Sequence, residues 1–98
     1  MEKLELKFQE DVFKWLYSHR VWFFRTQMGN KSGIPDIVCC MFGRFVGLEL
    51  KRTDGKGRAT KQQEKICKDI IDNKGIGAII SSIEELEELY KEVRDKYG

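Results

Sequence analysis

The sequence predicts a single small α/β domain with a mixed, mainly antiparallel central sheet and flanking helices. Residues 3–18 and 83–97 each repeat apolar side chains at three- and four-residue steps, which is the spacing of amphipathic helices. Residues 37–42 and 45–50 are two β-prone runs separated by a glycine and an arginine, which indicates a hairpin. A chain of 98 residues, 41% hydrophobic and 35% charged, has the composition of one globular domain, residues 1–98.

The first helix is expected to bury one apolar stripe, formed by Leu4, Phe8, Val12, Trp15 and Leu16. A second stripe holds one carboxylate, that of Glu10, among Leu6, Phe13 and Tyr17. Because glutamate is seldom buried without a partner, periodicity alone places Glu10 at the solvent edge of this stripe.

A first strand is expected over residues 21–27, with Trp22 and Phe24 on one side and Phe23 and Arg25 on the other. Residues 28–33 contain two glycines and read as a loop. Lys31 in this loop could contact a phosphate backbone, and surface solvation explains it equally well.

The hairpin is expected to have Gly43 and Arg44 as a two-residue turn, so that Phe42 faces Phe45, Val38 faces Glu49, and Asp36 faces Lys51. Side chains alternate across a strand. One face is then entirely apolar, with Ile37, Cys39, Met41, Val46, Leu48 and Leu50. The other face holds three charged side chains, those of Asp36, Glu49 and Lys51.

The charged face predicts a site for a hard metal ion. Mg²⁺ favours oxygen ligands and usually takes one or two protein carboxylates, which Asp36 and Glu49 can supply. Lys51 would place a positive charge beside the negative charge that develops in a transition state, either as a stabiliser or as a base. An incidental ion pair on the solvent face of a hairpin would show the same spacing.

Pro35-Asp36 followed by Glu49-x-Lys51 resembles the signature of the PD-(D/E)XK nucleases. With Gly33-Ile34-Pro35-Asp36-Ile37-Val38 and the later Gln63, the chain more specifically resembles the VRR-NUC (virus-type replication-repair nuclease) family, from the first helix to about residue 80. The resemblance implies a restriction-endonuclease-like α-β-β-β-α-β core. It also implies metal-dependent DNA cleavage, and stand-alone members that act as dimers on branched DNA.

The resemblance further assigns site residues. It implies that Glu10 supplies a helix-borne acid to the metal site, with Asp36 and Glu49 as the other carboxylate ligands. The backbone carbonyl of Leu50 is a further candidate ligand. Gln63 is expected near the start of a helix, either within the active site or as a member of a capping box with Thr60.

The second half of the chain predicts a basic loop, two helices and a strand. Residues 52–59 form the loop, in which Lys56 and Arg58 are placed to neutralise phosphates. A helix should then run from Thr60 to about Asn73, with Ile66, Cys67, Ile70 and Ile71 inward. Residues 76–80 fit a buried strand, and Ser82-x-x-Glu85 opens the last helix.

Charge is polarised along the chain. The net charge of +2 is small, yet residues 51–68 hold seven basic and two acidic side chains. Residues 82–98 hold six acidic and three basic ones, so the last helix should face away from DNA.

Several other classes of protein are disfavoured. His19 is the single histidine, and the three cysteines have no zinc spacing, so a His-ligated zinc enzyme is excluded. No phosphate-binding loop of an NTPase is present. The chain shows no signal peptide and no membrane-spanning run, which together with three reduced thiols predicts a cytoplasmic protein that does not bind membranes.

The sequence therefore predicts a Mg²⁺- or Mn²⁺-dependent DNA endonuclease that acts on branched DNA such as a four-way junction. The alternatives are a flap or nicking nuclease and a catalytically inactive DNA-binding module. A homodimer is expected, because paired cuts on a two-fold junction need two sites and the chain is rich in large apolar side chains. The residues 42–45 turn and the first strand are the first places to look for its interface.

Overall fold

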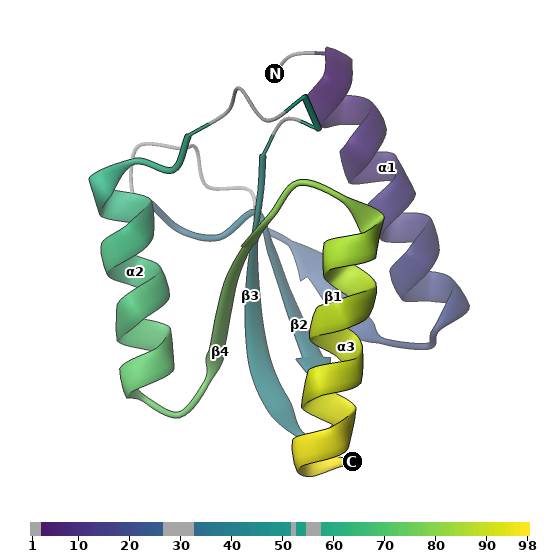
Figure 1. Ribbon diagram of the computed structural model, residues 1–98, viewed down its shortest axis with the longest axis vertical. Helices are drawn as coiled ribbons and strands as arrows, with labels where there is room; N and C mark the ends of the chain where they lie inside the picture. Colours follow the sequence, from purple (N-terminus) through teal and green to yellow (C-terminus); the bar gives the residue numbers. More distant parts are fainter. Residues whose placement is uncertain (1–2, 27–32, 52, 55–57) are drawn as a thin grey trace.

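The structure is a computed structural model that describes residues 3–26, 33–51, 53–54 and 58–98, with side chains from residue 6 (Figure 1). Its elements are α1 (Lys3–Ser18), β1 (Trp22–Arg25), β2 (Ile37–Met41), β3 (Arg44–Leu50), α2 (Lys61–Asp72), β4 (Ile76–Ile80) and α3 (Ile83–Tyr97). The order of the first six is the expected α-β-β-β-α-β. The expected loop residue Lys31 lies outside the described residues. None of the described helices is long and apolar enough to cross a membrane.

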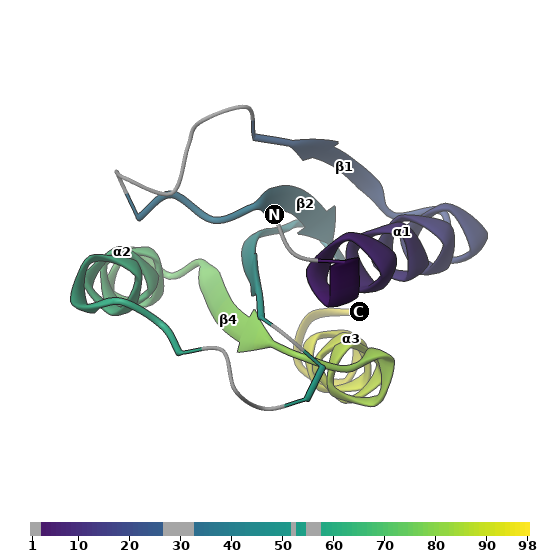
Figure 2. The same ribbon diagram turned by 90° about the horizontal axis from the view of Figure 1, so that it is seen from above.

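The four strands form one sheet in the order β1-β2-β3-β4. β1 pairs with β2 and β2 with β3 antiparallel, whereas β3 and β4 are parallel and joined through α2. Seen from above, α1 and α3 lie on one face of the sheet and α2 lies on the other (Figure 2). The mixed, mainly antiparallel sheet with flanking helices is confirmed.

The core lies between the sheet and the α1–α3 layer. All six residues predicted for the apolar hairpin face are buried, and Ile37, Val46 and Leu48 have no exposed surface at all. They pack against the predicted stripe of α1, of which Phe8, Val12, Trp15 and Leu16 are buried, and against Leu86 and Val93 of α3.

The register of the hairpin differs from the prediction by two residues. Ile37 pairs with Leu48 and Met41 with Arg44, so the turn residues are Phe42 and Gly43. Both have positive φ angles, 51° and 83°, as a type I′ turn requires, and glycine occupies its second central position. A shift of two residues leaves every side chain on its predicted face, which is why the hydrophobic pattern could not detect it.

The corrected register changes which charged residues meet. Continued by one residue beyond the Ile37–Leu48 pair, it sets Asp36 opposite Glu49 rather than opposite Lys51. Residues opposite each other on neighbouring strands lie roughly 5 Å apart. The two carboxylate-bearing residues are therefore closer neighbours than the sequence predicted.

Two predictions of burial in the second half of the chain are wrong. Strand β4 is an edge strand in which Ile80 is buried but Ile79 is 37% exposed. Ile71 on α2, predicted to face inward, is 52% exposed, whereas Ile66 and Ile70 are partly buried. A short apolar run does not show whether a further strand follows on its outer side, so edge and central strands look alike in the sequence.

The N-terminus of α3 is capped through Ser82 and Glu85. The Ser82 hydroxyl accepts a hydrogen bond from the Glu85 N–H (3.1 Å), and the Glu85 carboxylate accepts one from the Ser81 N–H (2.7 Å). The predicted capping box is thus displaced by one residue on its carboxylate side. The Ser81 N–H, helped by the Ser81 and Ser82 hydroxyls, lowers the pKa of Glu85 from its ordinary value of 4.5.

This cap predicts an acid-dependent part of the stability. Because the pKa of Glu85 is lower in the folded chain, its contribution is fully present above about pH 4.5 and is lost as the pH falls through the lowered pKa. Between about pH 5 and pH 3, the melting temperature of the parent should therefore fall more steeply than that of Glu85→Gln. Parallel curves for the two proteins would contradict this role, and Glu88→Gln on the exposed face of α3 is the control.

Candidate active site

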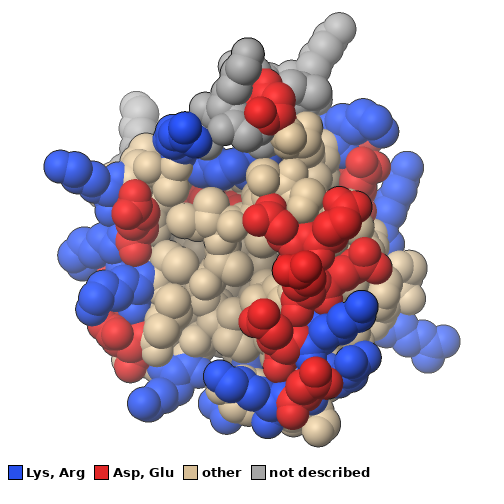
Figure 3. Space-filling model, viewed as in Figure 1, with Lys and Arg blue, Asp and Glu red and all other residues tan. Residues whose placement is uncertain are grey.

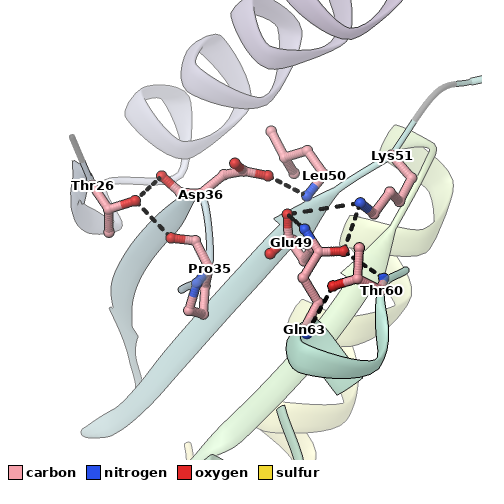
Figure 4. Close-up of polar contacts among 8 residues, drawn as sticks. All are labelled: Thr26, Pro35, Asp36, Glu49, Leu50, Lys51, Thr60 and Gln63. Atoms are coloured by element: carbon pink, nitrogen blue, oxygen red, sulfur yellow. Dashed lines mark hydrogen bonds and ion pairs between the residues drawn. The ribbon is translucent and has the colours of Figure 1, made fainter. Parts of the chain in front are cut away.

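Asp36 is held at the point where β2 begins. The Thr26 hydroxyl, just after β1, donates to the carbonyl oxygens of Pro35 (2.7 Å) and Asp36 (3.3 Å), and the Thr26 N–H donates to the latter as well (3.0 Å). The Asp36 carboxylate reaches across to β3, where its Oδ2 accepts a hydrogen bond from the Leu50 N–H at 2.8 Å (Figure 4). Both the backbone and the side chain of Asp36 are thereby fixed.

Glu49 is a buried carboxylate on the neighbouring strand. Its residue is only 5% exposed, and its Oε1 accepts a hydrogen bond from Gln63 Nε2 at 3.0 Å. Lys51 Nζ lies 4.0 Å from the same oxygen, with the lysine side chain 15% exposed. Glu49 is one of two buried polar or charged residues among those described, and the other is Gln63. A buried charge is costly unless it is paired and hydrogen-bonded, so this placement indicates a use for the charge.

Gln63 connects the helix to both charged residues. Its Oε1 accepts hydrogen bonds from Lys51 Nζ (2.8 Å) and from the Thr60 N–H (2.9 Å), while its Nε2 donates to Glu49 (Figure 4). The Thr60 hydroxyl accepts from the Gln63 N–H at 3.1 Å, which completes the capping box. The two roles that the sequence left as alternatives, helix cap and site residue, are thus performed by one side chain.

Gly33 places the start of the Gly33–Asp36 segment against the first turn of α2. Its φ angle is +74°, a conformation that favours glycine. A Cβ atom at this position would lie 2.8 Å from the carbonyl carbon and oxygen of Gln62 and 3.1 Å from the Gln63 nitrogen. The glycine therefore permits the close approach that brings Asp36 and Gln63 to the same end of the sheet.

Glu10 is not grouped with Asp36 and Glu49 in the described part of the chain. It is exposed on α1, as its position at the edge of the second stripe indicated. Among the described residues, no three His, Cys, Asp or Glu side chains are placed to hold one ion together. The structure therefore brings Asp36 and Glu49 together and does not gather Glu10 with them.

The backbone of Leu50 faces the site. Its N–H points to Asp36, and the N–H and C=O of one residue in an extended strand point to the same side. The Leu50 carbonyl is consequently directed toward the β2 side, where Asp36 lies. Its predicted role as a metal ligand stays a prediction.

No family is identified by comparison with known proteins. Family models, curated proteins and solved structures were compared with the chain, and none matches. The resemblance to the VRR-NUC family therefore depends on the residues of the site and their spacing.

Charge around the site follows the predicted polarity in part. Acidic side chains gather over α3, basic ones are more frequent over α2, and an uncharged strip lies between them over β4 (Figure 3). Burial raises the pKa of the Cys67 thiol on α2, and the negative charge of Glu49 raises it further. Lys56 of the predicted phosphate-binding loop lies outside the described residues, whereas Arg58 is described and exposed.

Some residues of the site gave no signal in the sequence. Thr26 and Thr60 act through hydrogen bonds to backbone groups, and Thr60 was recognised only as a helix cap. The link between Lys51 and Gln63 spans 12 residues and depends on how α2 packs on β3. Neither helical nor strand periodicity carries information on such a contact.

Replacing Gln63 by Leu should destabilise the fold. The substitution removes the hydrogen-bond partner of Lys51 and of the buried Glu49 together with half of the capping box. Such losses at buried polar groups cost about 1–3 kcal/mol each, so we expect the free energy of unfolding to drop by about 2–3 kcal/mol. Urea denaturation measures it, with the exposed neighbour Gln62→Leu as the control. Equal stabilities for the two variants would show that the Gln63 contacts are incidental.

Proposed function

We propose that the chain is a metal-dependent endonuclease that hydrolyses phosphodiester bonds in DNA. The observation that supports this most is the setting of Asp36 opposite Glu49 at one end of the sheet, with Lys51 joined to Glu49 through Gln63. The Pro-Asp and Glu-x-Lys residues of this set are those on which the resemblance to the PD-(D/E)XK nucleases rests, and the helix-borne glutamine belongs to the narrower resemblance to the VRR-NUC family. The proposal includes the restriction-endonuclease-like fold of that superfamily.

The donor set fits a hard divalent cation. Two carboxylates on neighbouring strands and a backbone carbonyl directed toward them are oxygen donors of the kind that Mg²⁺ and Mn²⁺ take. In the proposed site Asp36, Glu49 and the Leu50 carbonyl would hold the ion, and Glu10 is the further candidate ligand. When bound, such an ion polarises a phosphoryl oxygen and lowers the pKa of a coordinated water.

Hydrogen bonds within the chain orient the two carboxylates and the lysine of the site. The Leu50 N–H fixes the Asp36 carboxylate, and Gln63 holds Glu49 on one side and Lys51 on the other. Lys51 is thus a preorganised positive charge 4.0 Å from the Glu49 carboxylate, in position to offset the negative charge that grows on a phosphate during hydrolysis. Because Gln63 is anchored by the cap of α2, the positioning of Lys51 depends on that helix.

The preferred substrate in this proposal is branched DNA, cut by a homodimer. Two-fold symmetry would present the site twice to a two-fold junction. Exposed large apolar side chains are compatible with such an assembly, since Phe42, Ile79 and Tyr97 are 37%, 37% and 41% exposed. Sedimentation equilibrium with and without junction DNA tests this part, and the mass of a single chain under both conditions would remove the paired-cut mechanism.

A cleavage assay tests the function. Four-way junction, flap, linear duplex and single-stranded DNA are each incubated with the protein and Mg²⁺, Mn²⁺, Ca²⁺ or EDTA. The proposal expects cutting with Mg²⁺ or Mn²⁺ and none with EDTA. A protein that binds these DNAs and cuts none of them under any condition is a DNA-binding module instead.

A further inference from the structure

Three aromatic side chains are exposed on the face of the sheet that carries the candidate site. Trp22 and Phe24 of β1 are 66% and 48% exposed, and Phe45 of β3 is 51% exposed. Trp22 and Phe45 flank the exposed Cys40 of β2 in one row across three strands. We call Trp22, Phe24 and Phe45 the aromatic platform.

The platform exists because α2 covers only part of this face. Helix α2 packs on β4 and β3, and among the described elements no helix lies on the same side of β1 (Figure 2). The opposite side of β1 is covered, since Phe23 stacks on Phe13 of α1 with ring centroids 5.5 Å apart. The alternation of β1 thus buries one aromatic residue and presents two others to solvent.

The platform is continuous with the candidate active site. Phe24 pairs with Val38, and two residues further along the two strands, on the same face, lie Thr26 and Asp36. Two residues of a strand span roughly 7 Å, so the ring of Phe24 is one step from the Asp36 row and that of Trp22 is two steps. The Trp22 and Phe24 rings are 5.6 Å apart in an edge-to-face arrangement.

Cationic and polar groups lie at both ends of the platform. Lys51 is at the site, and Phe45 at the other end lines a pocket of about 400 Å³ together with Arg44, Lys74, Asn73 and Asp69. The Asp69 carboxylate is paired with Lys65 at 3.0 Å, and the Arg44 guanidinium lies over the ring of Tyr97, 4.0 Å from its centroid, so Lys74 supplies the positive charge of this lining. Lys74 and Asn73 can meet phosphates or polar base edges.

The exposed area favours a nucleotide over a second copy of the chain. With about 200 Å² for a large aromatic residue, the exposed fractions of 66%, 48% and 51% leave about 330 Å² of exposed surface on the three residues. A specific protein interface buries roughly 800 Å² on each partner, more than twice this area. A single base, in contrast, needs only one ring face to stack on.

We infer that the aromatic platform binds unpaired nucleotides. Their bases stack on Trp22, Phe24 and Phe45, and the sugar-phosphate backbone of the same strand runs toward the two opposed carboxylates of Asp36 and Glu49. The inference rests on the proposed nuclease function, which assigns Asp36 and Glu49 to the active site. It narrows the substrate class within branched DNA to a branch, such as a flap, that has an unpaired segment next to the bond to be cut. Open sheet faces that present aromatic side chains bind single-stranded nucleic acids by this physical principle.

The test measures binding without cleavage. Fluorescence anisotropy of a labelled oligothymidine of about 12 nucleotides is recorded in EDTA for the parent chain and for the double variant Trp22→Ala/Phe24→Ala. Stacking on one ring is worth roughly tenfold in affinity, so the double variant should bind about 100-fold more weakly. Tyr17→Ala is the matched control, because Tyr17 is 75% exposed and lies against Phe23 on the other side of β1.

Cys40 offers a second readout that needs no substitution in the platform. It is exposed between two of the rings, while Cys39 is buried with its pKa raised to about 12. In a Cys67→Ser background, saturating oligothymidine should slow the reaction of Cys40 with a thiol reagent at least tenfold. Duplex DNA of the same length should protect Cys40 much less.

The outcomes separate the inference from the proposed function. Unchanged affinity in the double variant, or unprotected Cys40, overturns the platform even if the protein cuts DNA. Weaker binding by the double variant supports the platform even if no DNA is cut under any condition. If the double variant sediments as one chain and the parent as two, while both bind oligothymidine equally, the three rings contact a second copy of the chain instead.

Discussion

Asp36→Asn and Lys51→Met are each expected to lower the rate of DNA cleavage by at least about 1000-fold while the chain stays folded. Removal of one preorganised electrostatic contact in an active site commonly costs 100- to 1000-fold, and each of these changes removes a full charge. Asn can still accept the hydrogen bond from the Leu50 N–H, and Met keeps most of the lysine stem. Single-turnover cleavage of junction and flap DNA with Mg²⁺ measures the loss.

The interpretation depends on two controls. Affinity for the same DNA in Ca²⁺ should fall far less than the cleavage rate in either variant, because Trp22, Phe24 and Phe45 are unchanged and only one charge is lost. Glu84→Gln, which removes one exposed carboxylate from the first turn of α3, should cut at the parental rate. Cleavage by Asp36→Asn within tenfold of the parent would exclude Asp36 from the metal site and with it the proposed assignment.

The sequence predicted the faces of the hairpin but not its register. Alternation within residues 37–41 and within residues 46–50 predicted six buried apolar side chains, and all six are buried in the structure, as is Glu49 on the other face. Register depends on the φ angles at the turn, and Phe42 with a φ of 51° is not a residue that favours this conformation. Hence the pairing of Asp36 with Glu49 could not be read from the pattern.

Contacts between elements set a second limit. The spacing of Thr60 and Gln63 predicted a helix cap, yet the same amide side chain also reaches Glu49 and Lys51 on β3. Long-range contacts of this kind depend on the packing of α2, to which local propensity is blind. Trp22 and Phe24 are likewise exposed because α2 packs on β3 and β4 and does not extend over β1.

Two glycines with positive φ angles differ in what surrounds them. Gly33 has a φ of +74°, and a Cβ atom added to it would lie only 2.8 Å from the carbonyl carbon and oxygen of Gln62. Gly43, with a φ of +83°, has nothing within 4 Å of that position. Substitution by Ala introduces comparable backbone strain at both sites but a steric clash only at Gly33.

Gly33→Ala is therefore expected to destabilise the chain by about 3 kcal/mol, whereas Gly43→Ala should cost only about 1 kcal/mol. The difference measures the contact between residue 33 and the first turn of α2, whose backbone atoms cannot move aside as a flexible side chain could. In a small domain with roughly 5 kcal/mol of stability, the larger loss leaves about 2 kcal/mol and thus an unfolded fraction of about 4%. Urea denaturation of both variants gives the two values. Equal losses would mean that α2 does not pack on the Gly33–Asp36 segment, and the positioning of Gln63 beside Asp36 and Glu49 would then need another explanation.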